Sequence, residues 1–542
     1  MCPPTASDSP HRLDGWKAIG RFLGRDARTA QRWAQGRQLP VRHIAGDGHS
    51  VFAWAHELQT WLNGTKEAAE PRIAQPGAAR APGLLVLPFE FRGPGGSDRA
   101  FVGDAVSAEV LNRLAVAPLR DLRVLSWTTS RAFAQSPKRA DQIAEDLGVR
   151  YLVEGGVADI GSHWSVDVRV VDALDDRVVL ADRFKADGKD VLRLHTTIAE
   201  AVSGHLSLSL AGSMLEPFWN DPVDPAAFLA YVGSWRAYTA GHDDGGLRRA
   251  VDLAGEAIRL DPAFTPAYAL RGLALNFYNN YIRYADASLD AETRAMARHA
   301  MDAGPRLATS NILDALVATY FDRDWDRSDE RYRFVLDRLP SEAHARRNLA
   351  FNLSLRGRMD EAQAELDLAG SVDRSPRLSM MQGMLHRFRR EYDAAIACHD
   401  RVLQALPGDP IGTLHAVEAE GLLLRDERRV RTRVAAADAA LSAQWGPYFD
   451  ACIAAACNDA EWLSAARTQW RERALGGSAE WYTDATLAGA AGDVEGVIDS
   501  LGRAIAAGRN EPVAHAGVDP VFDCARADPR FNALLRRIRL IA

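Results

Sequence analysis

Apolar residues near the start of the chain repeat at the three- and four-residue spacing of an amphipathic helix. The first helix has its apolar positions at Trp16, Ile19, Phe22 and Leu23. Gly24 is placed to end this helix, and the Asp26 carboxylate can cap the free backbone N–H groups of a second one. The second helix has its apolar positions at Ala27, Ala30, Trp33 and Ala34. The pattern therefore predicts two helices packed across a tight turn.

The opposite face of the second helix carries Arg and Gln side chains. Arg can hydrogen-bond two acceptors of guanine, and Gln can do the same with adenine. No acidic residue occurs between Arg28 and Arg42. We expect DNA contacts from ten residues of this segment: Arg25, Arg28, Thr29, Gln31, Arg32, Gln35, Arg37, Arg42, His43 and His49. The alternative is that this face is simply a solvated helix surface.

Residues 41–54 predict a β-hairpin, with Gly46 and Gly48 in its turn, and a helix containing Leu58, Trp61 and Leu62 follows. Over residues 13–63 the sequence resembles the winged helix-turn-helix domains of the MerR and excisionase group, especially the form that heads larger bacterial multidomain regulators. The resemblance implies binding to double-stranded DNA. Because one such module buries little surface, we expect a homodimer on paired half-sites.

Residues 65–82 are rich in Ala, Pro and Gly without apolar periodicity, which predicts a linker. From residue 83 to 210, strand and helix patterns alternate and predict a compact α/β domain. Strands are expected at 84–91, 122–126, 151–160 and 163–173, and helices at 104–115, at 138–148 and up to about residue 209. These runs resemble the TolB-like amino-terminal domain found beside tetratricopeptide arrays, which implies a role in assembly or signal coupling.

Beyond Pro217 the strand patterns stop and Ala-rich helical pairs follow to residue 542. Prolines that close successive pairs stand at Pro262, Pro305, Pro340 and Pro407, at separations of 43, 35 and 67 residues. These separations approximate one or two periods of about 34 residues, and the sequence resembles the tetratricopeptide repeat. The alternative is an irregular helical domain.

The predicted repeats would form a concave groove with inner helices exposed to a guest. We expect a protein or peptide partner there, an acidic segment or a C-terminus, because Arg side chains bind carboxylates with paired hydrogen bonds. The candidate partner-binding residues are Arg346, Arg347, Gln382, His386 and Arg389. Alternatively, these side chains only solvate the helices.

Composition places this pattern in a soluble, cytoplasmic protein. The net charge is −7, yet residues 11–64 carry about +4, so the basic segment heads an acidic body. The five cysteines are too few and odd in number for a disulfide scaffold, and no apolar stretch is long enough to span a membrane. Cys452 and Cys457 are spaced for core packing rather than for a zinc site.

The sequence lacks the common motifs of enzyme chemistry. The glycines at 93–96 lack the Lys and Ser or Thr of a phosphate-binding loop, and neither a Gly-x-Ser-x-Gly elbow nor a His-Glu-x-x-His motif occurs. We therefore expect no enzyme, no cofactor and no metal site.

The expected protein is multidomain: a small winged helix-turn-helix at 11–64, a linker at 65–82, a TolB-like α/β domain at 83–210, and an all-α tetratricopeptide solenoid with a C-terminal cap at 218–542. Its expected function is that of a DNA-binding transcriptional regulator whose body binds a protein or peptide signal. The alternative is a cytoplasmic tetratricopeptide scaffold or adaptor without sequence-specific DNA binding.

Overall fold

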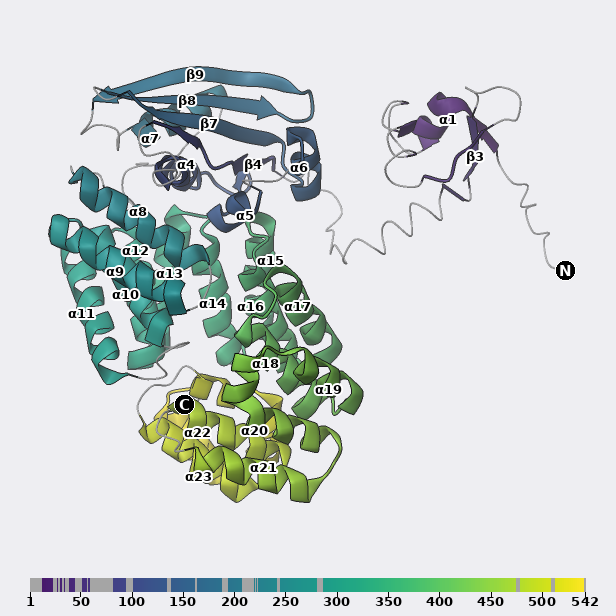
Figure 1. Ribbon diagram of the computed structural model, residues 1–542, viewed down its shortest axis with the longest axis vertical. Helices are drawn as coiled ribbons and strands as arrows, with labels where there is room; N and C mark the ends of the chain where they lie inside the picture. Colours follow the sequence, from purple (N-terminus) through teal and green to yellow (C-terminus); the bar gives the residue numbers. More distant parts are fainter. Residues whose placement is uncertain are drawn as a thin grey trace. The chain divides into compact units, whose positions relative to one another are not determined.

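The structure is a computed structural model. It divides into two units, 1–80 and 81–542, and each is described by itself (Figure 1). In the first unit it describes residues 12–22, 27, 30–31, 34, 39–43, 51–55 and 57–58. In the second it describes residues 81–93, 101–133, 138–160, 163–187, 194–206, 219, 221, 223–240, 244–279, 286–473, 478–507 and 512–540.

The first unit contains a helix and a small antiparallel sheet. Its elements are β1 (Arg12–Asp14), α1 (Gly15–Phe22), β2 (Arg42–His43) and β3 (Val51–Trp54), with strand order β1-β3-β2. Strands β2 and β3 pair as expected for the hairpin, with Arg42 opposite Phe52. The core contains Ile19, Ala30 and Leu58 as the helix pattern predicts, but Phe22 is exposed.

The second unit begins with a six-stranded mixed sheet. Its strands are β4 (Gly83–Val86), β5 (Glu90–Arg92), β6 (Arg123–Val124), β7 (Tyr151–Asp159), β8 (His163–Asp172) and β9 (Arg177–Asp187). The order is β6-β4-β7-β8-β9, with β5 also on β7. Strands β4 and β5 run parallel to β7, and β7, β8 and β9 are antiparallel. The single strand expected at 84–91 is divided around Pro88, which lacks a backbone N–H for the ladder.

Helices cover this sheet and connect it to the rest of the unit. They are α4 (Phe101–Leu114), α5 (Trp127–Ala132), α6 (Ala140–Leu147) and α7 (Leu194–His205). Alternate residues of β8, Val166, Val168 and Val170, are buried in one cluster with apolar residues of α4 and α7. Helix α4 also contacts the first helix of the body that follows, so sheet and body share one continuous packing arrangement (Figure 1).

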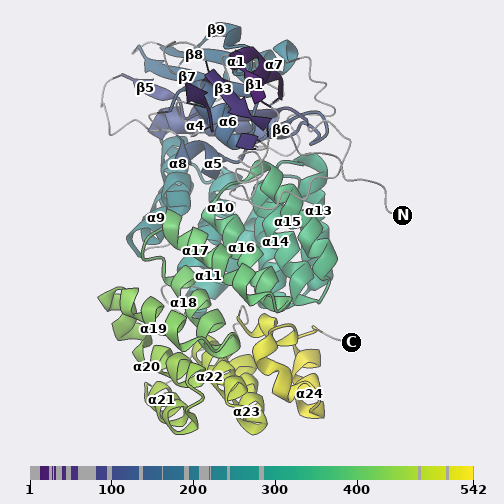
Figure 2. The same ribbon diagram turned by 90° about the vertical axis from the view of Figure 1, so that its right-hand side faces the viewer.

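The rest of the unit is a helical body built from successive helix pairs (Figures 1 and 2). The pairs are α8 (Pro225–Ala240) with α9 (Asp244–Leu260), α10 (Thr265–Tyr278) with α11 (Ala287–Ala303), α12 (Ala308–Val317) and η4 (Ala318–Asp322) with α13 (Trp325–Arg338), α14 (Ala343–Leu355) with α15 (Met359–Val372), α16 (Pro376–Phe388) with α17 (Tyr392–Ala405), α18 (Pro410–Glu418) and η5 (Ala419–Leu423) with α19 (Glu427–Ala436), α20 (Ala439–Ala456) with α21 (Ala460–Glu472), and α22 (Ser478–Ala490) with α23 (Val494–Ala506). The second unit is therefore mostly helical, with a body of tetratricopeptide type.

Prolines and glycines in the sequence mark the ends of these helices and the places where they approach closely. Pro262 and Pro305 follow the ends of α9 and α11, as predicted. A Cβ added at Gly272 on α10 would lie 2.5 Å from the Leu313 side chain, so this close approach of helices requires glycine. Gly357, in the turn between α14 and α15, has φ +72°, a conformation that other residues rarely adopt.

A C-terminal segment, residues 512–540, follows the last pair. It contains η6 (Pro512–Gly517), η7 (Pro520–Ala525) and α24 (Pro529–Arg537). Phe522 and Phe531 are fully buried in the cluster that includes α22 and α23. Among the described residues, no helix is both long and apolar enough to cross a membrane.

Candidate functional site: the inner face of the helical body

The first helices of successive pairs contact one another, α8 with α10, α10 with α12, α14 with α16, and α20 with α22. These first helices form a surface that we call the inner face. Helix α4 packs on it at α8, and the C-terminal segment packs on it at α14 and α22. Both ends of the expected groove are therefore partly covered by other parts of the same chain.

The sheet region is held to the body through Asp373, at the end of α15. The fully buried Asp373 carboxylate accepts hydrogen bonds from Arg347 of α14 and from the Ser126 hydroxyl, at 2.9 Å for the latter. The Ser126 backbone N–H also donates to the Val372 carbonyl at 2.7 Å, and Arg123 donates to the Ser371 carbonyl at 2.8 Å. These bonds join residues about 250 positions apart in the sequence.

A cavity of about 520 Å³ lies where α4 and α5 face the inner face at α8, α10, α12 and α14. Aromatic residues of the body line it: Trp219, Phe228, Tyr231, Trp235, Tyr238 and Phe264. Several titratable residues line it as well, among them Glu109 of α4 and His344 of α14. Burial raises the pKa of Glu109, and burial together with nearby Arg side chains lowers the pKa of His344 to about 3.

This cavity was not predicted from the sequence. The apolar repeat of residues 228, 231, 235 and 238 was a visible signal, because these residues lie at helical spacing. However, such a stripe is typical of any packed helix, and nothing in the sequence links it to Glu109 more than a hundred residues earlier.

The C-terminal segment is held to the inner face by a buried ion-pair network. Arg387 of α16 donates to Asp519 at 2.8 Å and pairs with Glu418 of α18. Glu418 also accepts from the Tyr448 hydroxyl at 2.7 Å. Although burial opposes ionisation, the charge of Arg387 holds the pKa of Glu418 well below its ordinary value. The network is thus charged and largely buried, with only the Glu418 side chain partly exposed.

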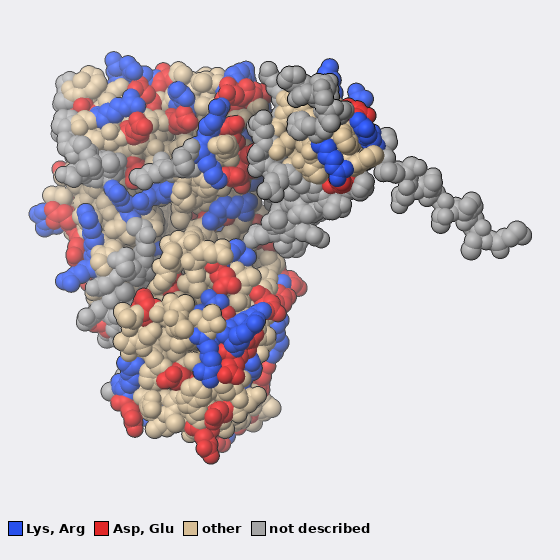
Figure 3. Space-filling model, turned by 45° about the vertical axis from the view of Figure 1, so that its right-hand side comes forward, with Lys and Arg blue, Asp and Glu red and all other residues tan. Residues whose placement is uncertain are grey.

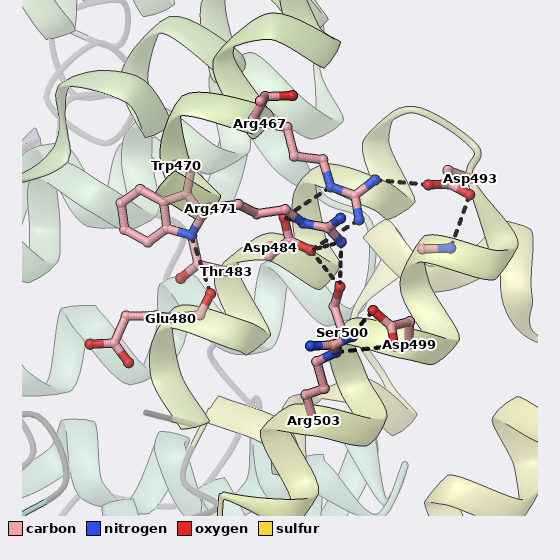
Figure 4. Close-up of polar contacts among 12 residues, drawn as sticks. Arg467, Trp470, Arg471, Glu480, Thr483, Asp484, Asp493, Asp499, Ser500 and Arg503 are labelled. Carbon is pink, nitrogen blue, oxygen red and sulfur yellow. Dashed lines mark hydrogen bonds and ion pairs between the residues drawn. The ribbon is translucent and has the colours of Figure 1, made fainter. Parts of the chain in front are cut away.

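A second buried carboxylate, Asp484 of α22, lies between two arginines (Figure 4). Arg467 donates to it at 2.9 and 3.0 Å, and Arg471 donates at 2.9 and 2.7 Å. The Ser500 hydroxyl of α23 donates as well, so the cluster joins α21, α22 and α23. Because both oxygens accept from the two arginines and Oδ2 also accepts from the hydroxyl, we assign the carboxylate to stability rather than to binding.

The five predicted partner-binding residues do not form one cluster. Arg346 pairs with Glu365 at 2.6 Å, and the buried Arg347 pairs with Asp373 and lines the cavity. His386 pairs with Glu391 at 2.5 Å, and Arg389 donates to Asp360 at 2.9 Å. Gln382 is part-exposed on α16. No observation tests their role, which stays a prediction.

Of the ten predicted DNA-binding residues, three lie within the described part of the chain. Gln31 is exposed and helical, and Arg42 is exposed on β2, where it pairs with Glu57 at 2.6 Å. His43 follows Arg42 on β2. The other seven lie outside the described residues: Arg25, Arg28, Thr29, Arg32, Gln35, Arg37 and His49.

Charged residues of both signs are interspersed over the face of the helical body seen in Figure 3. Exposed charged residues of the body form ion pairs with one another, such as Arg429 with Asp393 at 2.7 Å and Arg431 with Glu427 at 2.8 Å.

The buried thiol of Cys452 packs in the core as expected, and burial raises its pKa. Reactive thiolate chemistry is therefore disfavoured at this cysteine.

Comparison with known protein families finds no family model that matches the chain. A curated relative in Rhizobium meliloti (strain 1021), named "Putative adenylate cyclase 3", is 23% identical over 250 residues. The match covers 45% of this chain and 42% of the relative, so it spans less than half of that protein. It contradicts our expectation that the chain is not an enzyme, because the matched protein bears an enzyme's name.

Solved structures with similar folds include PilF of Pseudomonas aeruginosa, at 18% identity over 40% of this chain and 93% of that one, with a TM-score of 0.30. A tetratricopeptide repeat protein of Parabacteroides merdae matches at 13% identity over 55% of this chain and 98% of that one, with a TM-score of 0.28. The description of the body as a repeat array rests on its own helix pairs.

Proposed function

We propose that the chain is a protein-interaction scaffold whose helical body binds a protein or peptide partner. The observation that carries this proposal is the unbroken series of helix pairs from α8 to α23. Stacked pairs of this kind present long continuous surfaces, which suit extended partners. The proposal favours the adaptor alternative over a regulator that acts mainly through DNA.

We place the proposed partner surface on and just after helix α16, around Gln382, His386 and Arg389. Arg389 and His386 contact the exposed carboxylates Asp360 and Glu391, so both side chains can exchange to an incoming carboxylate at small cost. Arg346 and Arg347 contribute only if a partner displaces their buried pairs. The expected guest is an acidic or C-terminal segment.

Affinity capture with the full-length chain tests this surface. Arg389→Glu, combined with His386→Glu, should remove partners that the wild-type chain retains, because like charges would face the guest carboxylates. Arg503→Glu on α23 is the matched control, since Arg503 also forms an exposed pair, with Asp499. Recovery of the same proteins by all three chains would exclude this surface.

A second candidate function is binding to double-stranded DNA through residues 11–64. It is favoured by the exposed Gln31 and Arg42 and by the net charge of about +4 in this segment. Fluorescence anisotropy of the full chain with duplex DNA should show affinity that falls steeply with salt. Arg42→Ala should reduce the salt slope by about one if Arg42 contacts a phosphate. Binding that does not change with salt would contradict this function.

The cyclase-named relative adds one activity to examine. Incubating the full chain with ATP and a divalent cation, and measuring cyclic AMP, would show whether a cyclase activity accompanies the likeness. The likeness covers under half of that relative, so the scaffold proposal does not depend on the result.

A further inference from the structure

The cavity between the sheet region and the helical body has the dimensions of a small-molecule site. Its volume of about 520 Å³ lies within the range of roughly 300–1,000 Å³ typical of ligand pockets. It lies at a junction between two parts of one unit, where such pockets commonly occur. Helices α4 and α5 form one wall, and α8, α10, α12 and α14 form the other.

Aromatic rings dominate the body's side of the cavity. Tyr231 and Phe264 pack edge to face with ring centroids 5.1 Å apart, and Trp219 packs against Phe264 at 6.3 Å. Ring faces attract cations, most strongly where water is excluded. The aromatic wall therefore favours an organic ligand, and a cationic one in particular.

Glu109 of α4 supplies a carboxyl group to the same cavity. None of the ion pairs found among the described residues includes Glu109. The charge of Arg113, one turn further along α4, and a hydrogen bond with Asn112 both act on its carboxyl group, and Arg113 is itself bonded to His195 at 3.0 Å. Burial and the charge of Glu109 both raise the pKa of Tyr231, so the carboxyl and the aromatic group are close neighbours. A bound cation would compensate the charge of Glu109.

Three arginines line the cavity, Arg236, Arg347 and Arg377, and Arg236 lies near the Asp104 carboxyl of α4, which lines it as well. Arg347 pairs with Asp373, and Arg377 lies over the Tyr238 ring at 5.4 Å and donates to the Tyr238 carbonyl at 3.4 Å. An anion would have to compete with these contacts. The charge balance of the lining therefore favours a cation over an anion.

Two buried polar atoms of the lining point independently to a ligand. The Ser341 hydroxyl and the Trp219 indole N–H are buried without a hydrogen-bond partner among the described residues, and Ser341 is only 5% exposed. Buried polar groups are normally paired, by protein, water or ligand. The Ser341 oxygen can accept a hydrogen bond from an ammonium N–H, whereas the Trp219 N–H can only donate and so suits an acceptor group elsewhere on the ligand.

We propose that this cavity binds a small organic cation, an amine or quaternary ammonium with an alkyl or aryl group, with Glu109 as its counter-charge and the rings of Trp219, Tyr231 and Phe264 around it. The site is distinct from the scaffold surface around Gln382, His386 and Arg389, although Arg377 of the same helix lines the cavity. It gives the chain a small-molecule ligand in addition to its protein partner.

Isothermal titration calorimetry of the full-length chain tests the proposal with two probes of similar size, benzyltrimethylammonium and benzoate. The cation should bind at least about tenfold more tightly than the anion. Glu109→Gln keeps the side-chain shape and should weaken binding of the cation by about tenfold or more, whereas Glu256→Gln, at an exposed pair on α9, should leave it unchanged.

The comparison of the two probes uses the unaltered protein, so it decides the question even if Glu109→Gln does not fold. Equal or tighter binding of benzoate would overturn the cation assignment and point to the arginine side of the cavity. Absence of binding by both probes at millimolar concentration would overturn the site itself. Unchanged cation affinity in a folded Glu109→Gln chain would remove Glu109 from it.

Discussion

Replacing Asp519 by Asn should release the C-terminal segment from the inner face. In the native protein Asp519 is 2% exposed and accepts hydrogen bonds from Arg387 at 2.8 and 3.4 Å. It also accepts from the Tyr482 hydroxyl at 3.4 Å and from the Val521 backbone N–H at 3.2 Å. The amide keeps the volume but removes the charge that faces the guanidinium.

The magnitude follows from the burial of this ion pair. Removing one partner of a buried pair costs about 3–5 kcal/mol, because the other charge is left without compensation. Arg387 keeps its contact with Glu418, so the loss should lie at the lower end, about 3 kcal/mol. That corresponds to a docking equilibrium weakened about a hundredfold.

Hydrogen–deuterium exchange of the full chain measures this effect. Amides of residues 512–540 should exchange about a hundredfold faster in Asp519→Asn, while those of α8 to α13 change little. Asp499→Asn is the matched control, because the Asp499–Arg503 pair is half-exposed and worth no more than about 1 kcal/mol. Equal exchange rates for the amides of residues 512–540 in the Asp519→Asn and Asp499→Asn chains would refute this prediction.

Three further predictions concern stability. Asp484→Asn should destabilise the last helix pairs by about 3 kcal/mol or more, seen as a lower urea midpoint, because two arginines lose their shared carboxylate. Burial lowers the pKa of His344 and His515 to about 3, so both are neutral in the fold. Their contribution to folding stability is complete above the unfolded pKa near 6.5 and decreases as pH falls below it. The melting temperature should therefore decrease in thermal melts between pH 7 and pH 4. Gly272→Ala should lower the melting temperature, since its Cβ would lie 2.5 Å from Leu313, and a melt as stable as that of the native chain would contradict this.

The helix pairs could be predicted from the sequence because their signals are local. Proline after four of the pairs, at 262, 305, 340 and 407, and glycine in turns and at close contacts mark boundaries without reference to distant residues. Strand β9 was missed since Arg177–Asp187 is an edge strand with charged residues on it, so it lacks the alternation seen in β8. Helix α5 is short and capped by Ser126, and its six residues give too little periodicity to recognise.

The candidate sites were harder to predict because their contacts are distant in sequence. Arg347 was expected on an open groove. Its partner Asp373 instead lies at the end of α15, between two helix pairs, and also binds Ser126 of the sheet region. The cavity likewise combines Glu109 with aromatic residues of α8 and α10. Sequence identifies such residue types but not which of them become buried together.

The two kinds of ion pair on α16 determine where a partner can bind at low cost. A guest carboxylate that takes Arg389 displaces Asp360, which is fully exposed, so the exchange costs no more than about 1 kcal/mol. A guest that takes Arg387 must displace the buried Asp519 and with it the C-terminal segment, at a cost of about 3–5 kcal/mol. Partners of moderate affinity should therefore bind at Arg389 and leave the segment docked. If Asp519→Asn were to strengthen binding of such a partner tenfold or more, the partner would instead compete with the segment for the inner face.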